Sequence, residues 1–126
     1  MTRASDWLDG YIAAWASKDE SDVRTIFTDD AEYWFRPDDD RPVTGIDAIV
    51  KMWGDPEPSD PDHDLSVLIE NDTLAIITGT VNYPGHEKYS NMWEVWFADD
   101  GRAKKFVEWY MTPRKRGGQD SATNGA

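Results

Sequence analysis

The stretch KYSNMWEVWFADDGRAKKFVEWYMT, residues 88–112, decides the fold. It consists of two runs rich in aromatic residues and valine, which favour strands, on either side of the turn sequence Asp99-Asp100-Gly101. Strand side chains point alternately to the two faces of a sheet, so each run divides into two sets of side chains. We therefore predict an antiparallel hairpin of strands at Lys88–Phe97 and Ala103–Thr112.

Two further extended runs precede this hairpin. They cover Leu65–Glu70 and Thr73–Tyr83, and the turn sequences Asn71-Asp72 and Pro84-Gly85 follow them. Tight turns join antiparallel strands that are neighbours in a sheet. Together with the hairpin, these runs predict a four-stranded antiparallel meander.

The N-terminal region has helical spacing instead. Apolar residues recur every three or four positions in Ser5–Lys18, which predicts an amphipathic helix. The same spacing predicts a short second helix over Ser21–Phe27, with Asp19 or Ser21 as its N-terminal cap. Each of these helices has one apolar face to bury.

A strand and a third helix complete the N-terminal half. The aromatic run Ala31–Arg36 predicts a strand, and Pro37–Pro42, with three consecutive aspartates, predicts a loop. Thr44 and Asp47 resemble a capping box, and the apolar residues after them predict a helix that ends at Gly54. Three N-terminal helices followed by an antiparallel sheet predict the α+β class.

Two segments predict irregular structure. Asp55–Asp64 contains three prolines and five acidic residues, which is typical of a surface loop. Residues 114–126 are polar and have no apolar periodicity, so we expect a disordered tail after a single domain of residues 1–113.

Composition excludes several classes of function. The chain of 126 residues has no cysteine, which excludes a disulfide framework, a thiol nucleophile and cysteine-ligated metal sites. Its formal net charge of -12 argues against nucleic acid and anionic membrane as partners. No apolar run approaches the roughly 20 residues of a membrane helix. Asp6 and Trp7 stand where a signal peptide would have basic and apolar residues, so we expect a cytoplasmic protein.

The sequence also offers no motif for a metal or a cofactor. Asp38-Asp39-Asp40 and the alternating aspartates at 60, 62 and 64 lack the glycine and the terminal glutamate of a calcium loop. Glycine-rich nucleotide motifs and the nucleophile motif of serine hydrolases are missing as well. Any chemistry is therefore expected to be cofactor-free.

Five short motifs occur in one order along the chain. They are Asp19, Asp29-Asp30-Ala31, Gly45-Ile46-Asp47-Ala48-Ile49, Asp100-Gly101-Arg102 and Glu108-Trp109-Tyr110. In this order and spacing the chain resembles the SnoaL-like branch of the nuclear transport factor 2-like superfamily over about residues 5–112. The resemblance implies a curved sheet wrapped around a helix into a cone, with a ligand pocket at the open end and a dimer formed through the outer sheet face. The superfamily includes ketosteroid isomerases, polyketide cyclases and dehydratases, but also proteins that only bind, so the fold alone does not define an activity.

The resemblance also singles out individual positions. Tyr11 lies eight residues before Asp19, as the oxyanion-hole tyrosine does in ketosteroid isomerases. Two positions differ from that family, because Phe35-Arg36-Pro37 replaces its general-base aspartate and Trp93 replaces its protonated aspartic acid. A steroid-isomerase mechanism is therefore not expected.

Glu108 is the first candidate for chemistry. By resemblance, Trp93 and the alternating set Phe106, Glu108 and Tyr110 face the interior of the cone. A carboxyl group among aromatic rings has a raised pKa, which suits general acid or base catalysis. The alternative is that Glu108 pairs with an arginine such as Arg36 or lies at a solvated rim.

The remaining candidates support a pocket around Glu108. Tyr11 is a candidate catalytic hydroxyl or a packing residue, and His63 is a candidate base if its loop folds over the pocket mouth, or a surface histidine. The candidate ligand-binding residues are Trp15, Trp34, Trp53, Asn91, Trp93, Phe106 and Tyr110.

Two functions remain open from the sequence. The first is a homodimeric protein that holds a small apolar or cyclic molecule and isomerises, cyclises or dehydrates it by acid–base catalysis. The second is a non-catalytic ligand-binding or assembly protein of the same fold, which the lack of a clear second acid–base residue near Glu108 favours.

Overall fold

The computed structural model describes residues 3–55 and 61–112. Within them the chain forms three helices and six strands of a mixed α+β fold. In chain order they are α1 (Arg3–Ser17), α2 (Glu20–Arg24), β1 (Phe27–Trp34), β2 (Val43–Thr44), α3 (Ile46–Trp53), β3 (Asp62–Glu70), β4 (Leu74–Asn82), β5 (Lys88–Phe97) and β6 (Ala103–Met111). No helix in these two segments is long and apolar enough to cross a membrane.

The predicted meander is confirmed. The described strands form one sheet in the order β2-β1-β6-β5-β4-β3, in which β3, β4, β5 and β6 are consecutive antiparallel neighbours. The prediction of a purely antiparallel sheet is wrong, because β1 pairs parallel with β6. This pairing brings the N-terminal strand beside the last strand of the chain.

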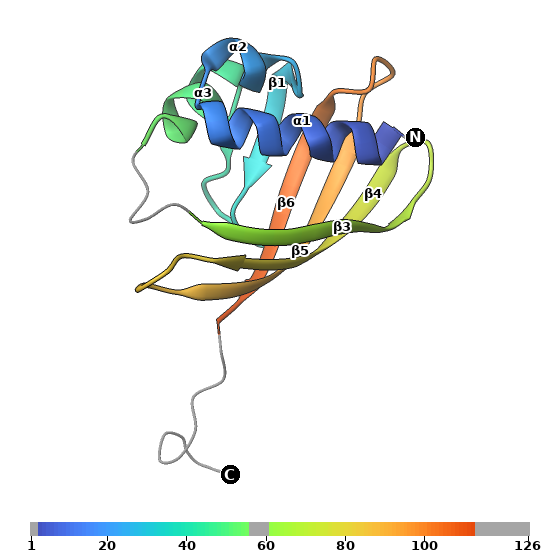
Figure 1. Ribbon diagram of the computed structural model, residues 1–126. Helices are drawn as coiled ribbons and strands as arrows, with labels where there is room; N and C mark the ends of the chain where they lie inside the picture. Colours follow the sequence, from blue (N-terminus) through green and yellow to red (C-terminus); the bar gives the residue numbers. More distant parts are fainter. Residues whose placement is uncertain (1–2, 56–60, 113–126) are drawn as a thin grey trace.

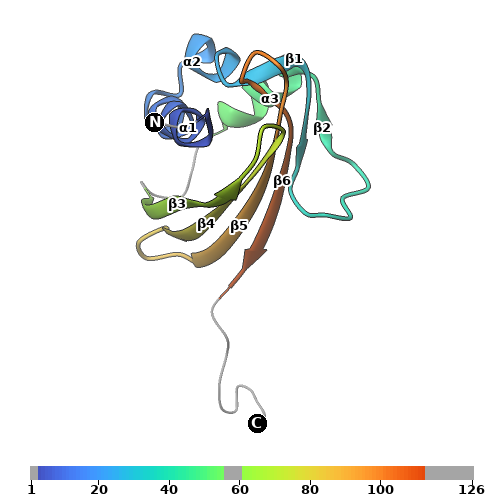
Figure 2. The same ribbon diagram turned by 90° about the vertical axis from the view of Figure 1, so that its right-hand side faces the viewer.

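The sheet is bent, and α1 lies on the inside of the bend. Figure 1 shows α1 crossing in front of the strands, with α2 and α3 together near one end of the sheet. Figure 2 shows the curvature of β3 to β6 with α1 seen end-on inside it. The inner face of the sheet is therefore covered by helices, and its outer face is not covered by any described element.

A single aromatic core fills the space between α1 and the sheet. The apolar face of α1 is buried, and the Trp7 indole N–H donates a 2.8 Å hydrogen bond to the carbonyl oxygen of Ile26. Ile49 and Trp53 on α3 are buried as well. Phe27 and Phe106 are fully buried, and Phe27 packs edge to face against Trp7 and Phe106 at centroid distances of 6.0 and 6.4 Å.

Three predicted boundaries are wrong in detail. The second helix ends at Arg24, and Phe27 begins β1, because its backbone pairs with Ala103 of β6. Asp19 caps this helix by accepting a hydrogen bond from the backbone N–H of Ser21, as one of the two predicted caps. The predicted strand at Ala31–Arg36 ends at Trp34.

The third helix follows β1 and β2 in the chain, so the three helices do not all precede the sheet. The predicted capping box of this helix is absent, because Thr44 belongs to β2 and Gly45, with a φ of 91°, occupies the N-cap without a side-chain hydrogen bond. Asp47 instead accepts a 2.8 Å hydrogen bond from Arg24 of α2.

The predicted acidic loop at Asp55–Asp64 is shorter than expected. Asp62, His63 and Asp64 belong to β3, where they pair with residues of β4. Backbone hydrogen bonding to β4 outweighs the low strand propensity of aspartate. Residues 56–60 of this loop and the predicted tail at 114–126 lie outside the described residues.

Candidate functional site

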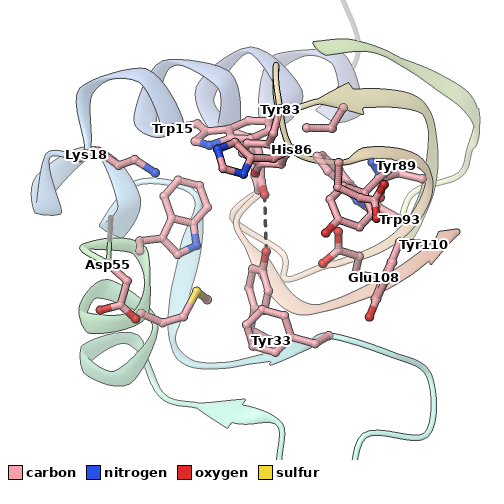
Figure 3. Close-up of a pocket in the computed structure, with 17 residues that line it drawn as sticks. Trp15, Lys18, Tyr33, Asp55, Tyr83, His86, Tyr89, Trp93, Glu108 and Tyr110 are labelled. Carbon is pink, nitrogen blue, oxygen red and sulfur yellow. Dashed lines mark hydrogen bonds between the residues drawn. The ribbon is translucent and has the colours of Figure 1, made fainter. Parts of the chain in front are cut away.

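A cavity of about 740 Å³ lies between the concave face of the sheet, α1 and the end of α3. This volume is typical of sites for drug-sized molecules. Its inner wall comes from alternate residues of β5 and β6, and its sides come from α1, β1, α3 and the turn between β4 and β5. Figure 3 shows Glu108 and Tyr33 pointing into this space, with Lys18 and Asp55 on the opposite side.

Glu108 is the carboxyl group of the inner wall. It lies on β6 opposite Trp93 of β5, so the two side chains share the concave face. Burial among apolar groups raises the pKa of Glu108 from 4.5 to about 7, and the nearby Trp93 indole N–H opposes this only in part. The predicted alternative of an ion pair with Arg36 is wrong, because Arg36 pairs with Asp38 at 2.9 Å on the surface.

Two tyrosine hydroxyl groups lie near Glu108. Tyr11 of α1 and Tyr33 of β1 are both buried, and their hydroxyl oxygens are 3.5 Å apart (Figure 3). Burial raises the pKa of Tyr33 well above 10, and the neighbouring Tyr11 and Glu108 add to this effect. Tyr33 is therefore protonated at neutral pH, and it can donate a hydrogen bond into the cavity.

Two polar atoms of the inner wall have no hydrogen-bond partner. The Trp93 indole nitrogen and the Asn91 side-chain oxygen are buried and unpaired in the described part of the chain. The Trp93 indole N–H acts on the Glu108 carboxylate as a hydrogen-bond donor and lowers its pKa, although the geometry falls outside that of a well-formed hydrogen bond. Buried polar groups in proteins are nearly always paired with protein, water or ligand.

Charged side chains gather at the rim of the cavity. Lys18, Asp55, His86 and Glu87 all line it, and all four residues are exposed. Lys18 follows α1 with a φ of 56°, a left-handed conformation that is uncommon for a residue with a Cβ. Its ammonium group lies 6.0 Å from the centre of the Trp53 ring. Both signs of charge therefore occur at the entrance, whereas the inner wall carries only the carboxyl group of Glu108.

Most of the sequence-predicted site residues lie at this cavity. Its lining includes Tyr11, Trp15, Trp53, Asn91, Trp93, Glu108 and Tyr110. Phe106 shares their face of the sheet but is fully buried beneath the rings of Tyr11, Tyr33 and Trp93. It therefore supports the cavity wall rather than lining it.

Two predicted residues lie elsewhere. Trp34 is on the outer face of the sheet, because its partner across the strands is Val107, the neighbour of the inward-facing Glu108. His63 is on the edge strand β3 outside the cavity lining, and its ring stacks on Trp15 at a centroid distance of 5.6 Å. His63 therefore contacts Trp15 but does not itself line the cavity.

The sequence reasoning missed several lining residues. The most important is Tyr33, which alternates with Trp34 on β1 and therefore has to face the opposite side of the sheet. Alternation within β1 separates these two residues but does not say which one faces inward. His86 and Glu87 were missed because their position in a turn gives no periodic signal.

A family model agrees with this architecture. The model of the SnoaL-like domain matches residues 8–109. The chain belongs to the SnoaL-like domain family. The resemblance found in the sequence motifs is thereby confirmed, and the family places the chain in the nuclear transport factor 2-like superfamily.

Solved structures share the fold at low sequence identity. A protein from Sphaerobacter thermophilus is 19% identical with a TM-score of 0.71, and the match covers 86% of this chain and 95% of that one. A nuclear transport factor 2-like protein from Burkholderia xenovorans is 17% identical with a TM-score of 0.70, covering 92% and 88%. A steroid delta-isomerase from Pseudomonas aeruginosa is 15% identical with a TM-score of 0.64, covering 88% and 81%. No curated protein matches the chain.

Proposed function

We propose that this SnoaL-like protein binds a small apolar or cyclic molecule in its cavity and moves a proton on it, as a cofactor-free isomerase, cyclase or dehydratase. The observation that carries the proposal is Glu108, a carboxyl group on an aromatic wall with a pKa of about 7. At that pKa both protonation states are well populated near neutral pH, so the group can accept a proton and return it. A steroid delta-isomerase among the proteins of similar fold is consistent with such chemistry.

The surroundings of Glu108 suit this role. Aromatic walls bury a cyclic ligand, and the absence of an ion pair at Glu108 among the described residues leaves its carboxylate available to the ligand. In the proposed step the carboxylate takes a proton from a carbon beside a carbonyl group, and the electron pair moves to the carbonyl oxygen. Tyr11 and Tyr33 supply hydroxyl donors for the negative charge that develops there. Return of the proton to another atom completes an isomerisation.

The test measures proton exchange, because that step needs no knowledge of the natural substrate. We expect the protein to accelerate deuterium exchange at the activated carbons of 2-tetralone in D2O, followed by NMR. Glu108→Gln keeps the shape of the side chain but removes the base, and it should lower this acceleration by roughly 10²- to 10⁴-fold. Tyr11→Phe should lower it less, because it removes one hydrogen-bond donor.

The matched control is Glu94→Gln on the outer face, which should accelerate deuterium exchange in 2-tetralone as much as the wild-type protein does. An NMR titration of Glu108 provides a second measurement and should give a pKa near 7. An ordinary exposed-glutamate pKa, or equal exchange with wild type and Glu108→Gln, would contradict the proposal.

A non-catalytic ligand-binding protein is the second candidate. It is favoured by the observation that, within residues 3–55 and 61–112, the pKa of Glu108 is affected by burial and Trp93 alone and not by a second acid–base group. Under this alternative, 2-tetralone quenches tryptophan fluorescence on binding but its exchange rate is that of free solution.

We also propose a homodimer that forms through the outer face of the sheet. Trp109 and Met111 of β6 are exposed there, beside partly buried Met92 and Trp96 of β5. A group of large apolar side chains exposed on one sheet face is typical of an interaction surface. Light scattering should give twice the chain mass of 14.4 kDa, and Trp109→Glu should give the monomer mass. A wild-type mass near 14.4 kDa at micromolar concentration would contradict the dimer.

A further inference from the structure

The cavity combines one inner carboxyl group with a lining of aromatic rings. Glu108 is only partly buried, and its carboxyl group points into the cavity (Figure 3), so a ligand atom can reach it. Aromatic side chains from α1, α3 and the sheet make up more than half of the other lining residues. A cation is attracted both to a carboxylate and to the faces of aromatic rings. This combination of groups therefore favours a positively charged ligand.

The Glu108 carboxylate has no positive partner within the described part of the chain. Its pKa responds to burial and to the Trp93 indole N–H, and not to a neighbouring cation. Trp93 supplies one donor, whereas a carboxylate has about four acceptor sites. Charged groups removed from water are normally paired. A ligand that brings a positive charge to Glu108 would supply the partner that the protein does not.

The charges at the rim do not prevent the entry of a cation. Lys18 and His86 lie at the rim together with Asp55 and Glu87, so groups of opposite sign offset one another. The ammonium group of Lys18 lies over the ring of Trp53, 6.0 Å from its centre, so a lining ring of this cavity already contacts a cation. The formal net charge of -12 also attracts cations from solution.

We propose that the cavity binds a protonated cyclic amine, whose ammonium group pairs with the Glu108 carboxylate while its ring system lies among the aromatic side chains. The inference goes beyond the proposed function, because it gives the ionised carboxylate a second class of ligand and needs no reaction. It rests on the proposed function only in using the same cavity. The ammonium group donates hydrogen bonds to the carboxylate, and neither group transfers its proton.

The affinity for the amine should depend on pH through Glu108. The other titratable groups at the cavity are the hydroxyl groups of tyrosines on α1, β1, β5 and β6 and after β4, and the four charged rim residues. Tyrosine and alkyl amines ordinarily titrate near pH 10, so they keep their protons between pH 5 and pH 8. Glu108 ionises near pH 7, and the ionised form is the one that pairs with a cation. Binding should therefore strengthen as the pH rises from 5 to 8.

Two bicyclic probes of the same shape test the proposal on the wild-type protein. The probes are 2-aminotetralin, which is protonated over this pH range, and the uncharged alcohol 2-tetralol. At pH 8 calorimetry should show that the amine binds roughly 10- to 100-fold more tightly than the alcohol, the range for one hydrogen bond to a charged group. At pH 5 most of this advantage should be lost, because Glu108 is then protonated.

Substitutions assign the advantage to one carboxyl group. Glu108→Gln keeps the shape of the side chain but removes the charge, so the amine and the alcohol should bind this variant about equally at pH 8. Any pH dependence that remains in this variant belongs to His86 or another rim group. Glu94→Gln on the outer face is the matched control and should keep the full advantage. Circular dichroism establishes that each variant is folded, and the wild-type pH series decides the question if one is not.

Four outcomes would overturn the proposal. They are equal affinities of the wild-type protein for the two probes at pH 8, tighter binding of the alcohol, an amine advantage that survives Glu108→Gln, and no binding of either probe up to its solubility limit. Because the readout is binding, the result is separate from catalysis. A protein that prefers the amine but does not accelerate exchange in 2-tetralone keeps the cation site and loses the proposed acid–base function. Acceleration of that exchange without a preference for the amine gives the reverse result.

Discussion

Both faces of the sheet carry tryptophan and glutamate, but the two faces differ in the hydrogen bonding and the burial of these residues. On the outer face, the indole N–H groups of Trp96 and Trp109 donate to the two carboxylate oxygens of Glu94 at 3.0 and 2.7 Å. Trp34 donates in the same way to Glu32 at 2.9 Å. On the inner face, Trp93 lies opposite Glu108, and there burial raises the pKa of the glutamate to about 7 while the Trp93 N–H offsets this only in part.

The tryptophan–glutamate pairs of the outer face stabilise the sheet, whereas Trp93 and Glu108 of the inner face line the cavity. On the outer face the tryptophans donate hydrogen bonds to glutamates that remain partly exposed to water. On the inner face the glutamate is desolvated instead, which raises its pKa. The contrast supports the concave side as the place of the proposed site.

The largest expected effect concerns Glu108 and pH. The folded protein binds a proton at Glu108 more tightly than the unfolded chain does, because burial raises the pKa from 4.5 to about 7. The stability from this group is complete below pH 4.5 and is lost as the pH rises through about 7. The difference corresponds to roughly 3 kcal/mol.

Glu108→Gln should therefore be more stable than wild type at pH 8, by up to roughly 3 kcal/mol, and about equal to it at pH 4. Urea unfolding at both pH values measures this. Glu94→Gln on the outer face should show no such gain at pH 8, because it breaks hydrogen bonds to Trp96 and Trp109. If the unfolding free energies of Glu108→Gln and Glu94→Gln depended on pH equally, the carboxyl groups of the two faces would not differ in burial.

The next effect concerns the inner tryptophan. Trp93→Phe should lower the free energy of unfolding by about 2 kcal/mol, because it opens a gap in a packed wall while removing an unpaired N–H group. The variant should also bind 2-tetralone more weakly, because Trp93 forms part of the cavity wall. Thermal unfolding and fluorescence titration measure the two losses, and unchanged values for both would mean that Trp93 does not face the cavity.

The smallest effect concerns the outer tryptophan. Trp109→Phe removes the 2.7 Å hydrogen bond to Glu94 at an exposed position, so it should cost about 1 kcal/mol in the monomer. Binding of 2-tetralone should not change, because Trp109 points away from the cavity. Denaturation at low protein concentration keeps this cost separate from that of dimer dissociation. A weaker affinity of the Trp109→Phe variant for 2-tetralone would contradict the difference between the inner and outer faces.

Strand alternation together with the motif resemblance was sufficient for the last hairpin, but alternation alone was insufficient for the first strand. In β5 and β6 the motif resemblance identified which set faces inward, so Trp93, Glu108 and Tyr110 were placed correctly on one face. In β1 the sequence contains Tyr33 and Trp34 side by side, and only the parallel pairing with β6 shows that Tyr33 faces the cavity. Parallel pairing between distant segments leaves no turn sequence between them, so no local pattern reveals it.

The sequence by itself determined most of the elements, because helical spacing and strand alternation are local and tight turns report which strands are neighbours. It also determined that Glu108 shares a strand face with large aromatic rings. Only the tertiary structure decided that Arg36 stays on the surface, that Tyr33 joins Tyr11, and that burial raises the pKa of Glu108. Desolvation and hydrogen-bond pairing depend on which groups from distant segments surround an atom in space, and those surroundings exist only after the sheet has bent around α1.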